Sequence, residues 1–269
     1  MKKIFNSPVV TIALFEFREN IRNKWLLIYG LSFLIFSGIL TYIGTGDPLQ
    51  ASASLLNLVL LLVPLFSLVF GSISFSEALP FHEILVALPI SRRDIFLGKW
   101  IGLGTGLVLS FLLGMGAGSL IQFNIAQQGF GSYLLLLCLG CCLTFIFLSI
   151  SFYVVTLARK KELIFGWMLL LWFFFFVLFD VLVFGVVLLF GDYPLEIPVL
   201  ILMLLNPIDL ARVMLLLKID LAAMMGYSGA LFQKYLGNTL GLFIGGGALA
   251  LWTLLPAWLG LRTFQKKDL

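Results

Sequence analysis

The sequence predicts an all-α membrane protein with six transmembrane helices and both termini in the cytosol. Of its 269 residues, 61% are hydrophobic and only 11% are charged, whereas an average soluble domain is roughly 45–50% apolar and about 25% charged. A soluble protein of this length could not bury so much apolar surface, so lipid must be part of its solvent. The net charge of +4 comes from short scattered clusters, and no nucleic-acid partner is expected.

Six apolar stretches are long enough to cross the hydrocarbon core, which takes about 20 residues. We expect residues 1–269 to form a single transmembrane domain. The fifth stretch is longer than one crossing needs, so it should tilt, kink or extend beyond the membrane. The predicted spans are residues 25–43, 55–76, 101–122, 133–157, 163–190 and 240–261.

The positive charges predict the orientation. Most Lys and Arg residues fall in the N-terminus, the loops after the second and fourth spans, and the C-terminus. These segments all lie in the cytosol if the chain crosses six times and begins inside. A seventh, short span at residues 197–205 would move the C-terminal cluster outside. That stretch is therefore expected in a helical extracytoplasmic loop before the last span, as a re-entrant or surface-lying pair of helices.

An amphipathic helix is predicted before the first span, with Ser7 as its N-cap and Pro8 in its first position. A helix of this kind lies in the membrane surface. The alternative is a basic segment that only sets the topology. The two faces at helical spacing are Val10, Leu14, Phe17 and Ile21 on the apolar side, and Glu16, Glu19, Asn20 and Asn23 on the polar side.

The cytosolic loop after the second span carries a short apolar stripe bounded by Pro80 and Pro89. We expect a helix there that docks on a protein partner, although the stripe could instead pack on its own membrane domain. Ser91 is expected to cap the following helix, with Asp94 at the capping-box position. The stripe consists of Phe81, Ile84, Leu85 and Leu88.

Small residues recur at every fourth position of the third span and predict a ridge that packs closely against another helix. In the external loop, Asn206, Pro207 and Asp209 have the spacing of a helix start, with Asn206 as the cap. The ridge residues are Gly102, Gly106, Ser110, Gly114 and Gly118.

The chain carries no motif of an enzyme. Gly98-Lys99 lacks the glycine that a phosphate-binding loop has five residues earlier. Cys138 and Cys142 share a helix face and are weak candidates for Cu(I), since free cysteine in a helix usually packs as a small hydrophobe; no other metal site is expected. Asp180, inside the fifth span, is either a carboxylate on a substrate path or a paired or hydrated residue near the outer end.

Two motifs give the chain a resemblance to a known family. Leu88-Pro89-Ile90-Ser91-Arg92, with Leu97-Gly98-Lys99 at the start of a span, resembles the corresponding stretch of ABC-2-type permeases. One departure is that Glu77 and then Pro80-Phe81-His82-Glu83 replace the family's usual Glu-x-Glu-x-Gly-Thr cluster. The resemblance implies a cytosolic coupling helix that docks on a separate ATPase, which binds ATP and Mg. The coupling residues would be Glu77, Phe81, Glu83, Ile84, Leu85, Leu88, Arg92 and Arg93.

Within that family the chain is most similar to NosY-type permeases of nitrous-oxide-reductase maturation, through residues 55–64, 206–212 and 229–234. The resemblance implies two copies in the bacterial inner membrane, each with a NosF-like ATPase. It also implies a periplasmic β-helical, NosD-like partner outside, for which Asn206, Asp209 and Arg212 are the docking candidates. The complex would supply copper or sulfur to nitrous oxide reductase.

An ABC-2 exporter of a lipid, peptide or drug-like substrate is the alternative function. Because one copy offers no evident aqueous route, we expect a homodimer in which the second and fifth spans meet. Asn57 and Asp180 are the candidates for that interface or path.

Overall fold

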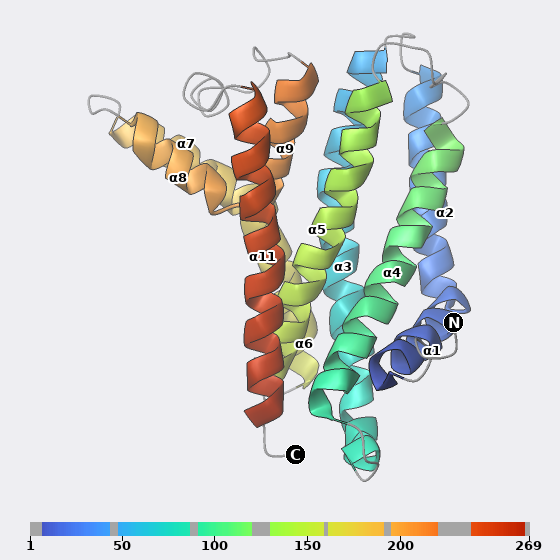
Figure 1. Ribbon diagram of the computed structural model, residues 1–269. Coiled ribbons are helices and arrows are strands. Elements are labelled where there is room, and N and C mark those ends of the chain that lie inside the picture. The colour runs from blue at the N-terminus through green and yellow to red at the C-terminus, as the bar shows by residue number, and fades with distance from the viewer. Residues whose placement is uncertain are drawn as a thin grey trace.

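The computed structural model describes residues 7–43, 48–86, 91–119, 130–158, 161–190, 195–219 and 238–266. Within these ranges every regular element is a helix, which confirms the all-α class. Upright helices run side by side and alternate in direction along the chain (Figure 1). They are α2 (Lys24–Ile43), α3 (Pro48–Val86), α4 (Arg92–Ser119), α5 (Phe130–Leu157), α6 (Lys161–Phe173) and α11 (Asn238–Lys266).

Of the remaining elements, α9 (Pro207–Ile219) is also upright, whereas α1 (Pro8–Ile21), α7 (Phe179–Leu189) and α8 (Glu196–Leu204) are inclined (Figure 1). Helix α1 lies across the lower part of α4 (Figure 1). Helix α6 continues through a π-helical turn, η2 (Phe174–Leu178), into α7, which leans away from the bundle. Helices α8 and α9 then form a pair bent by 109°. The predicted kink in the fifth stretch and the predicted helix pair are both confirmed.

The described residues contain five to seven candidate membrane spans. Five helical stretches are individually long and apolar enough to cross: Ser54–Glu77, Arg92–Ala117, Phe130–Leu157, Glu162–Leu189 and Phe243–Lys266. Two bent pairs, α1 with α2 and α8 with α9, qualify only when the members of each pair are taken together. The six-span count lies within this range, and it stays a prediction together with the N-in/C-in orientation.

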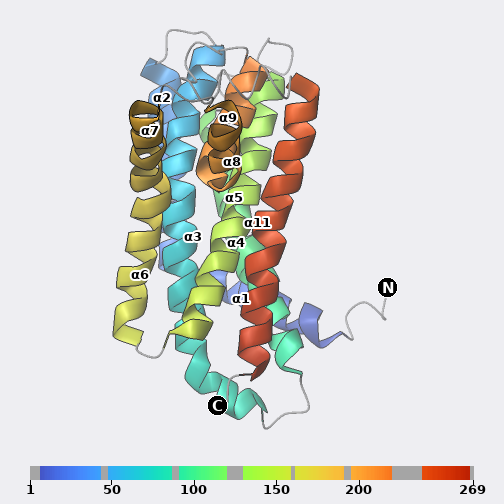
Figure 2. The same ribbon diagram turned by 90° about the vertical axis from the view of Figure 1, so that its left-hand side faces the viewer.

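Helix α3 corrects one expectation about the cytosolic loop. Pro80 does not bound a separate short helix, because α3 is continuous through this residue to Val86. Proline removes one backbone donor and crowds the preceding turn, which bends a helix without ending it. The lower end of α3 indeed turns away from the rest of the helix (Figure 2). Phe81, Glu83, Ile84 and Leu85 belong to this end, and their side chains, like all of Leu88, lie outside the described residues.

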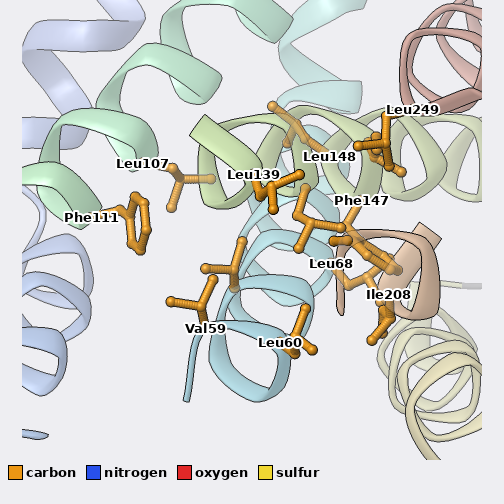
Figure 3. Packing of buried hydrophobic residues seen from close by; sticks show 14 of the residues in the cluster. Val59, Leu60, Leu68, Leu107, Phe111, Leu139, Phe147, Leu148, Ile208 and Leu249 are labelled. Carbon is orange, nitrogen blue, oxygen red and sulfur yellow. The ribbon is translucent and has the colours of Figure 1, made fainter. Parts of the chain in front are cut away.

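The apolar core runs along the middle of the bundle, where α3, α4 and α5 meet α9 and α11 (Figure 3). Buried residues make up 50%, 56% and 61% of the spanning parts of α3, α4 and α5, but only 11% of the stretch from α6 to α7. In lipid, helices associate through close packing and interhelical hydrogen bonds rather than through the hydrophobic effect. The stretch from α6 to α7 therefore presents most of its apolar surface to lipid or to another chain.

The predicted ridge on α4 is confirmed as a close-packing surface, and its partners are α1 and α2. A Cβ atom at Gly102 would lie 2.6 Å from the main-chain oxygen of Ala13, and one at Gly114 would collide with the main-chain oxygen of Gly30. The backbones therefore approach as closely as only glycine allows. The contact runs over Gly98, Gly102, Gly106 and Gly114; the side-chain surroundings of Gly118 lie outside the described residues.

We predict opposite labelling at the two ends of the bundle. In a variant whose native cysteines are replaced, Gly131→Cys at the upper start of α5 should react from outside with a membrane-impermeant maleimide. Glu162→Cys at the lower start of α6 should react only after lysis. Both positions are exposed, and a Cβ atom at Gly131 would have no neighbour within 4 Å. Labelling of Glu162→Cys in intact cells would contradict the six-span topology.

We also predict that Gly102→Val destabilises the protein, because the added methyl groups must push α1 away from α4. Overpacking of this kind costs typically about 1–3 kcal/mol. Thermal unfolding of the purified protein measures the effect. Gly116→Val on the same helix is the matched control, since a Cβ atom there has no neighbour within 4 Å. Equal melting temperatures for the two variants would show that the ridge does not hold α1 in place.

Candidate functional site

Four phenylalanine side chains join the lower ends of four helices. Phe75 of α3 stacks on Phe152 of α5 with ring centroids 4.3 Å apart. Phe96 of α4 and Phe264 of α11 complete the cluster, with centroids 5.5 to 6.0 Å from their neighbours. All four rings are at most 1% exposed. The lower end of α3 is thereby packed against three other helices, just above the predicted coupling segment.

The coupling residues whose side chains the structure describes lie around this cluster. Glu77 is exposed on α3, two residues beyond Phe75, and Arg93 is exposed at the start of α4. Arg92 donates from Nη1 to the main-chain oxygen of Gln265 on α11, at 3.3 Å. The expected cap of α4 is confirmed, because Ser91 Oγ accepts from the backbone N–H of Asp94 at 3.1 Å. Contact of these residues with an ATPase stays a prediction.

A buried ion pair fixes α1 on α4. Lys99 Nζ donates to Glu16 Oε1 at 2.7 Å, and the two side chains are 8% and 13% exposed. The preceding Gly98 lets α1 come close, since a Cβ atom there would lie 2.7 Å from Ile12 Cβ. The Leu97-Gly98-Lys99 motif therefore holds α1 against α4, and Lys99 is engaged with the Glu16 carboxylate.

Sequence reasoning missed this pair and the aromatic cluster. In the sequence, Lys99 stands out as part of the cytosolic charge clusters and of the Leu97-Gly98-Lys99 motif, and Glu16 as part of a polar helix face. That face does not point uniformly to water: Asn20, next to the pair, is 8% exposed, and its Nδ2 donates to the main-chain oxygen of Glu16 at 2.8 Å. Glu16 and Asn20, four residues apart on one face of α1, were the available sequence signal for this buried polar contact.

A polar junction lies higher in the bundle than the aromatic cluster, where α9 begins (Figure 1). Asn206 Nδ2 donates to the main-chain oxygen of Phe175 at 2.9 Å and to Asp209 Oδ2 at 2.7 Å. Its Oδ1 accepts from the backbone N–H of Ile208 at 3.0 Å, which confirms the expected cap. Asn206 is fully buried and Asp209 is 8% exposed. Both therefore hold α9 inside the protein, and α9 is inserted into the bundle rather than lying on a surface.

Arg212 extends this junction to the fifth stretch. Its Nη1 donates to Asp209 Oδ1 at 3.0 Å and to Asp180 Oδ2 at 3.1 Å. The side chains of Arg212 and Asp180 are 29% and 45% exposed. Asp180 is thus a paired residue, one of the two alternatives that its sequence position left open. The predicted docking of an external partner on this region is not tested by these contacts.

The π-helical turn η2 lies at the same junction. It contains Phe175, whose main-chain oxygen accepts the hydrogen bond from Asn206. π-Turns are rare and often occur where another group enters the backbone ladder of a helix. The break between α6 and α7 therefore coincides with the point at which α9 is attached.

The other predicted residues are exposed. Asn57 lies on the exposed side of α3, one turn before Leu61, whose main-chain oxygen accepts from Trp172 Nε1 of α6 at 3.1 Å. Cys138 and Cys142 are exposed on α5. Among the described residues, no three His, Cys, Asp or Glu side chains lie close enough to hold a metal ion.

We predict that Asn206→Asp loosens α9. The substitution replaces an amide donor with a carboxylate oxygen that faces the Phe175 carbonyl and Asp209, at a fully buried position. Loss of a buried charged or hydrogen-bonded partner costs about 3–5 kcal/mol, so the melting temperature should fall sharply. Asn23→Asp is the control, because only its Oδ1 is used, as acceptor from Trp25 N at 3.1 Å. Equal stability of both variants would contradict the junction.

Comparison with known proteins agrees with these features. The sequence profile described as "ABC-2 family transporter protein" matches residues 10–269. A protein of Pseudomonas aeruginosa named "Probable ABC transporter permease protein NosY" is 32% identical over 94% of both chains. A protein of the same name from Stutzerimonas stutzeri is 28% identical over 95% of both chains. The chain is therefore similar to NosY permeases, and it belongs to the ABC-2 family of transporter proteins.

Proposed function

We propose that this chain is the permease subunit that converts ATP hydrolysis by a separate, NosF-like ATPase into movement across the inner membrane. The observation that carries the proposal is the continuity of α3. This helix has 39 residues and is about 58 Å long at 1.5 Å per residue, against about 30 Å of hydrocarbon core. It therefore reaches well beyond the membrane, and its lower end is the predicted coupling segment.

A push on that lower end would spread through the aromatic cluster. Phe75 lies 11 residues before Val86, or about 16 Å along the helix, and its ring is packed among α4, α5 and α11. Closely packed side chains transmit displacement because interiors have few voids. The ATPase would bind ATP and Mg, and this chain would supply only the moving helices.

The same helices reach the polar junction. Both α5 and α11 pack against α9, and Trp252 Nε1 of α11 donates to the main-chain oxygen of Leu204, at the end of α8, at 3.0 Å. A displacement that begins at the coupling segment therefore has a contiguous packed route to α8 and α9. Asn206, Asp209 and Arg212 would set the position of α9 beneath a NosD-like partner on the outer side.

The functional unit in this proposal is a homodimer. The stretch from α6 to α7 is only 11% buried, and Asn57 on the neighbouring α3 is exposed. An exposed amide in a spanning helix is costly in lipid unless another chain or water meets it. A second copy packed on this side would enclose Asn57 and place Asp180 near the interface.

The similarity to NosY permeases favours copper or sulfur supply to nitrous oxide reductase as the purpose of the complex. The alternative is an ABC-2 exporter of a lipid, peptide or drug-like substrate, which would use the same coupling end. Both functions need the ATPase to bind this chain, but only the first makes nitrous oxide reductase depend on that binding. The same two variants can therefore test the ATPase contact and the purpose of the complex.

We predict that Ile84→Asp combined with Leu85→Asp abolishes co-purification of the ATPase, since two carboxylates would enter an apolar contact. An uncompensated charge buried in a contact costs about 3–5 kcal/mol, or more than a hundredfold in affinity. Leu157→Asp, an exposed leucine at the lower end of α5, is the matched control and should leave co-purification intact. The measurement is pull-down from membranes in which both variants are inserted equally.

The same strains can be assayed for nitrous oxide reduction and for the copper content of the reductase. These measurements test whether the complex supplies nitrous oxide reductase. We expect the double variant to lose both and the control to keep them. Retained co-purification in the double variant would remove the lower end of α3 as the main contact. Lost co-purification with normal reductase would instead favour the exporter function.

A further inference from the structure

A cavity of about 590 Å³ lies where α1 meets α2, α3 and α4. One wall is apolar and is formed by Leu26, Phe70, Ile73 and Leu103. At the rim are two aromatic side chains, Phe15 and Trp25, which are 65% and 62% exposed. The polar wall consists of Glu16, Glu19, Asn20, Asn23, Glu77 and Lys99. Glu77 follows Ile73 by one turn on the descending α3, and Lys99 precedes Leu103 by one turn on the ascending α4, so these charged groups lie toward the lower end of the cavity (Figure 1). The cavity is thus amphipathic.

The charges of the polar wall do not balance. Lys99 is matched by Glu16, with which it forms the buried pair. Glu19 and Glu77 form no ion pair with any residue that the structure describes. Two carboxylates in excess, facing a space with an apolar wall, favour a cationic occupant. Since no three acidic, Cys or His side chains among the described residues converge on a metal position, an organic cation fits better than a metal ion.

The level of the cavity relative to the membrane indicates where its occupant comes from. Trp25 lies in the first turn of α2, and tryptophan at the end of a spanning helix marks the level of the lipid headgroups. Glu16 and Glu19 lie on α1, which crosses the lower part of the bundle at that level (Figure 1). In the six-span orientation this is the cytosolic leaflet. A molecule that presents a cation at this depth beside an apolar wall is an amine-headed lipid.

We propose that the cavity binds a phospholipid with a primary ammonium headgroup, such as phosphatidylethanolamine. The ammonium lies between Glu19 and Glu77, to which its N–H groups donate, and an acyl chain follows Ile73 and Phe70 toward the membrane. The exposed Arg22 and Lys24, on either side of Asn23 in the sequence, are the cations for the lipid phosphate. Phosphatidylcholine has no N–H donor and phosphatidylglycerol has no cation, so neither satisfies the two carboxylates.

This site would connect lipid composition with the coupling end. Glu77 is two residues from Phe75 on α3, whereas Glu19 lies on α1. A bound ammonium therefore bridges the interfacial helix and the helix that carries the coupling segment. The binding itself needs no ATPase, so its test is separate from that of the proposed function.

The experiment uses the full-length protein in nanodiscs that contain equal amounts of phosphatidylethanolamine, phosphatidylcholine and phosphatidylglycerol. Lipids retained after mild detergent extraction are counted by native mass spectrometry. Wild type should retain phosphatidylethanolamine selectively. Glu19→Gln combined with Glu77→Gln should lower its retention by roughly tenfold, the effect of losing a hydrogen bond to a charged group. Glu162→Gln, the same change on an exposed residue at the lower end of α6, should retain as much as wild type.

Two results would overturn the proposal. The first is that wild type retains the three lipids equally, or that the double variant retains as much phosphatidylethanolamine as the control. Either observation would show that only the surrounding lipid is measured. Displacement of the bound lipid by millimolar free phosphoethanolamine would assign the cavity to a soluble amine instead. If the double variant unfolds, the single Glu19→Gln change, at an exposed side chain of α1, gives the same comparison.

Discussion

The constraint on which this structure depends is that polar groups surrounded by lipid must find their partners within the protein. Several of the groups that meet it among the described residues lie between two helices. Lys99 and Glu16 join α4 to α1, and Arg212 joins α9 to Asp180 on α7. Indole N–H groups act in the same way, since Trp172 donates to α3 and Trp252 to α8. Because apolar faces pack in lipid with little preference for one partner, these contacts decide which helices become neighbours.

Shape complementarity then sets how tightly the neighbours pack. On α4, glycines lie where the backbones of α1 and α2 come closest, at Gly102 and Gly114. At the lower ends the opposite solution is used, and four large rings fill the space among α3, α4, α5 and α11. The stretch from α6 to α7 has neither feature over most of its length and remains at the edge of the bundle. In the part of the chain that the structure describes, a densely packed centre is thus flanked by the more exposed stretch from α6 to α7.

Local features of the fold could be predicted from the sequence, because they depend on neighbouring residues. The caps at Ser7, Ser91 and Asn206 form as their spacing indicated. The ridge on α4 was visible as a period of four, although its partners were not. Pro80 misled the prediction because a missing N–H bends a helix but need not end it, and only the continuous α3 shows which outcome occurs.

Long-range pairs could not be predicted, for a physical reason. Glu16 and Lys99 are 83 residues apart and Asp180 and Arg212 are 32 apart, and no spacing rule links residues on different helices. From the sequence, Asp180 could be a residue on a substrate path or a paired residue. A carboxylate inside a span is costly in either case, so the sequence does not distinguish the two until the partner is known. Contacts with an ATPase or a second copy depend on other chains, so one sequence states only which surfaces are available.

Under the proposed function, the aromatic cluster and the polar junction would respond differently to displacement. The rings of the cluster make no directional bonds, so they could shift against one another while remaining packed. The polar junction is directional, because one guanidinium serves two carboxylates on different elements. The bond from Arg212 to Asp209 lies within α9 and survives any rigid movement of that helix. The bond to Asp180 joins α9 to α7 and must lengthen when the two separate, so a gradual movement below would meet an abrupt resistance above. In the proposed function, such a contact, made or broken as a unit, would convert continuous motion into two distinct arrangements.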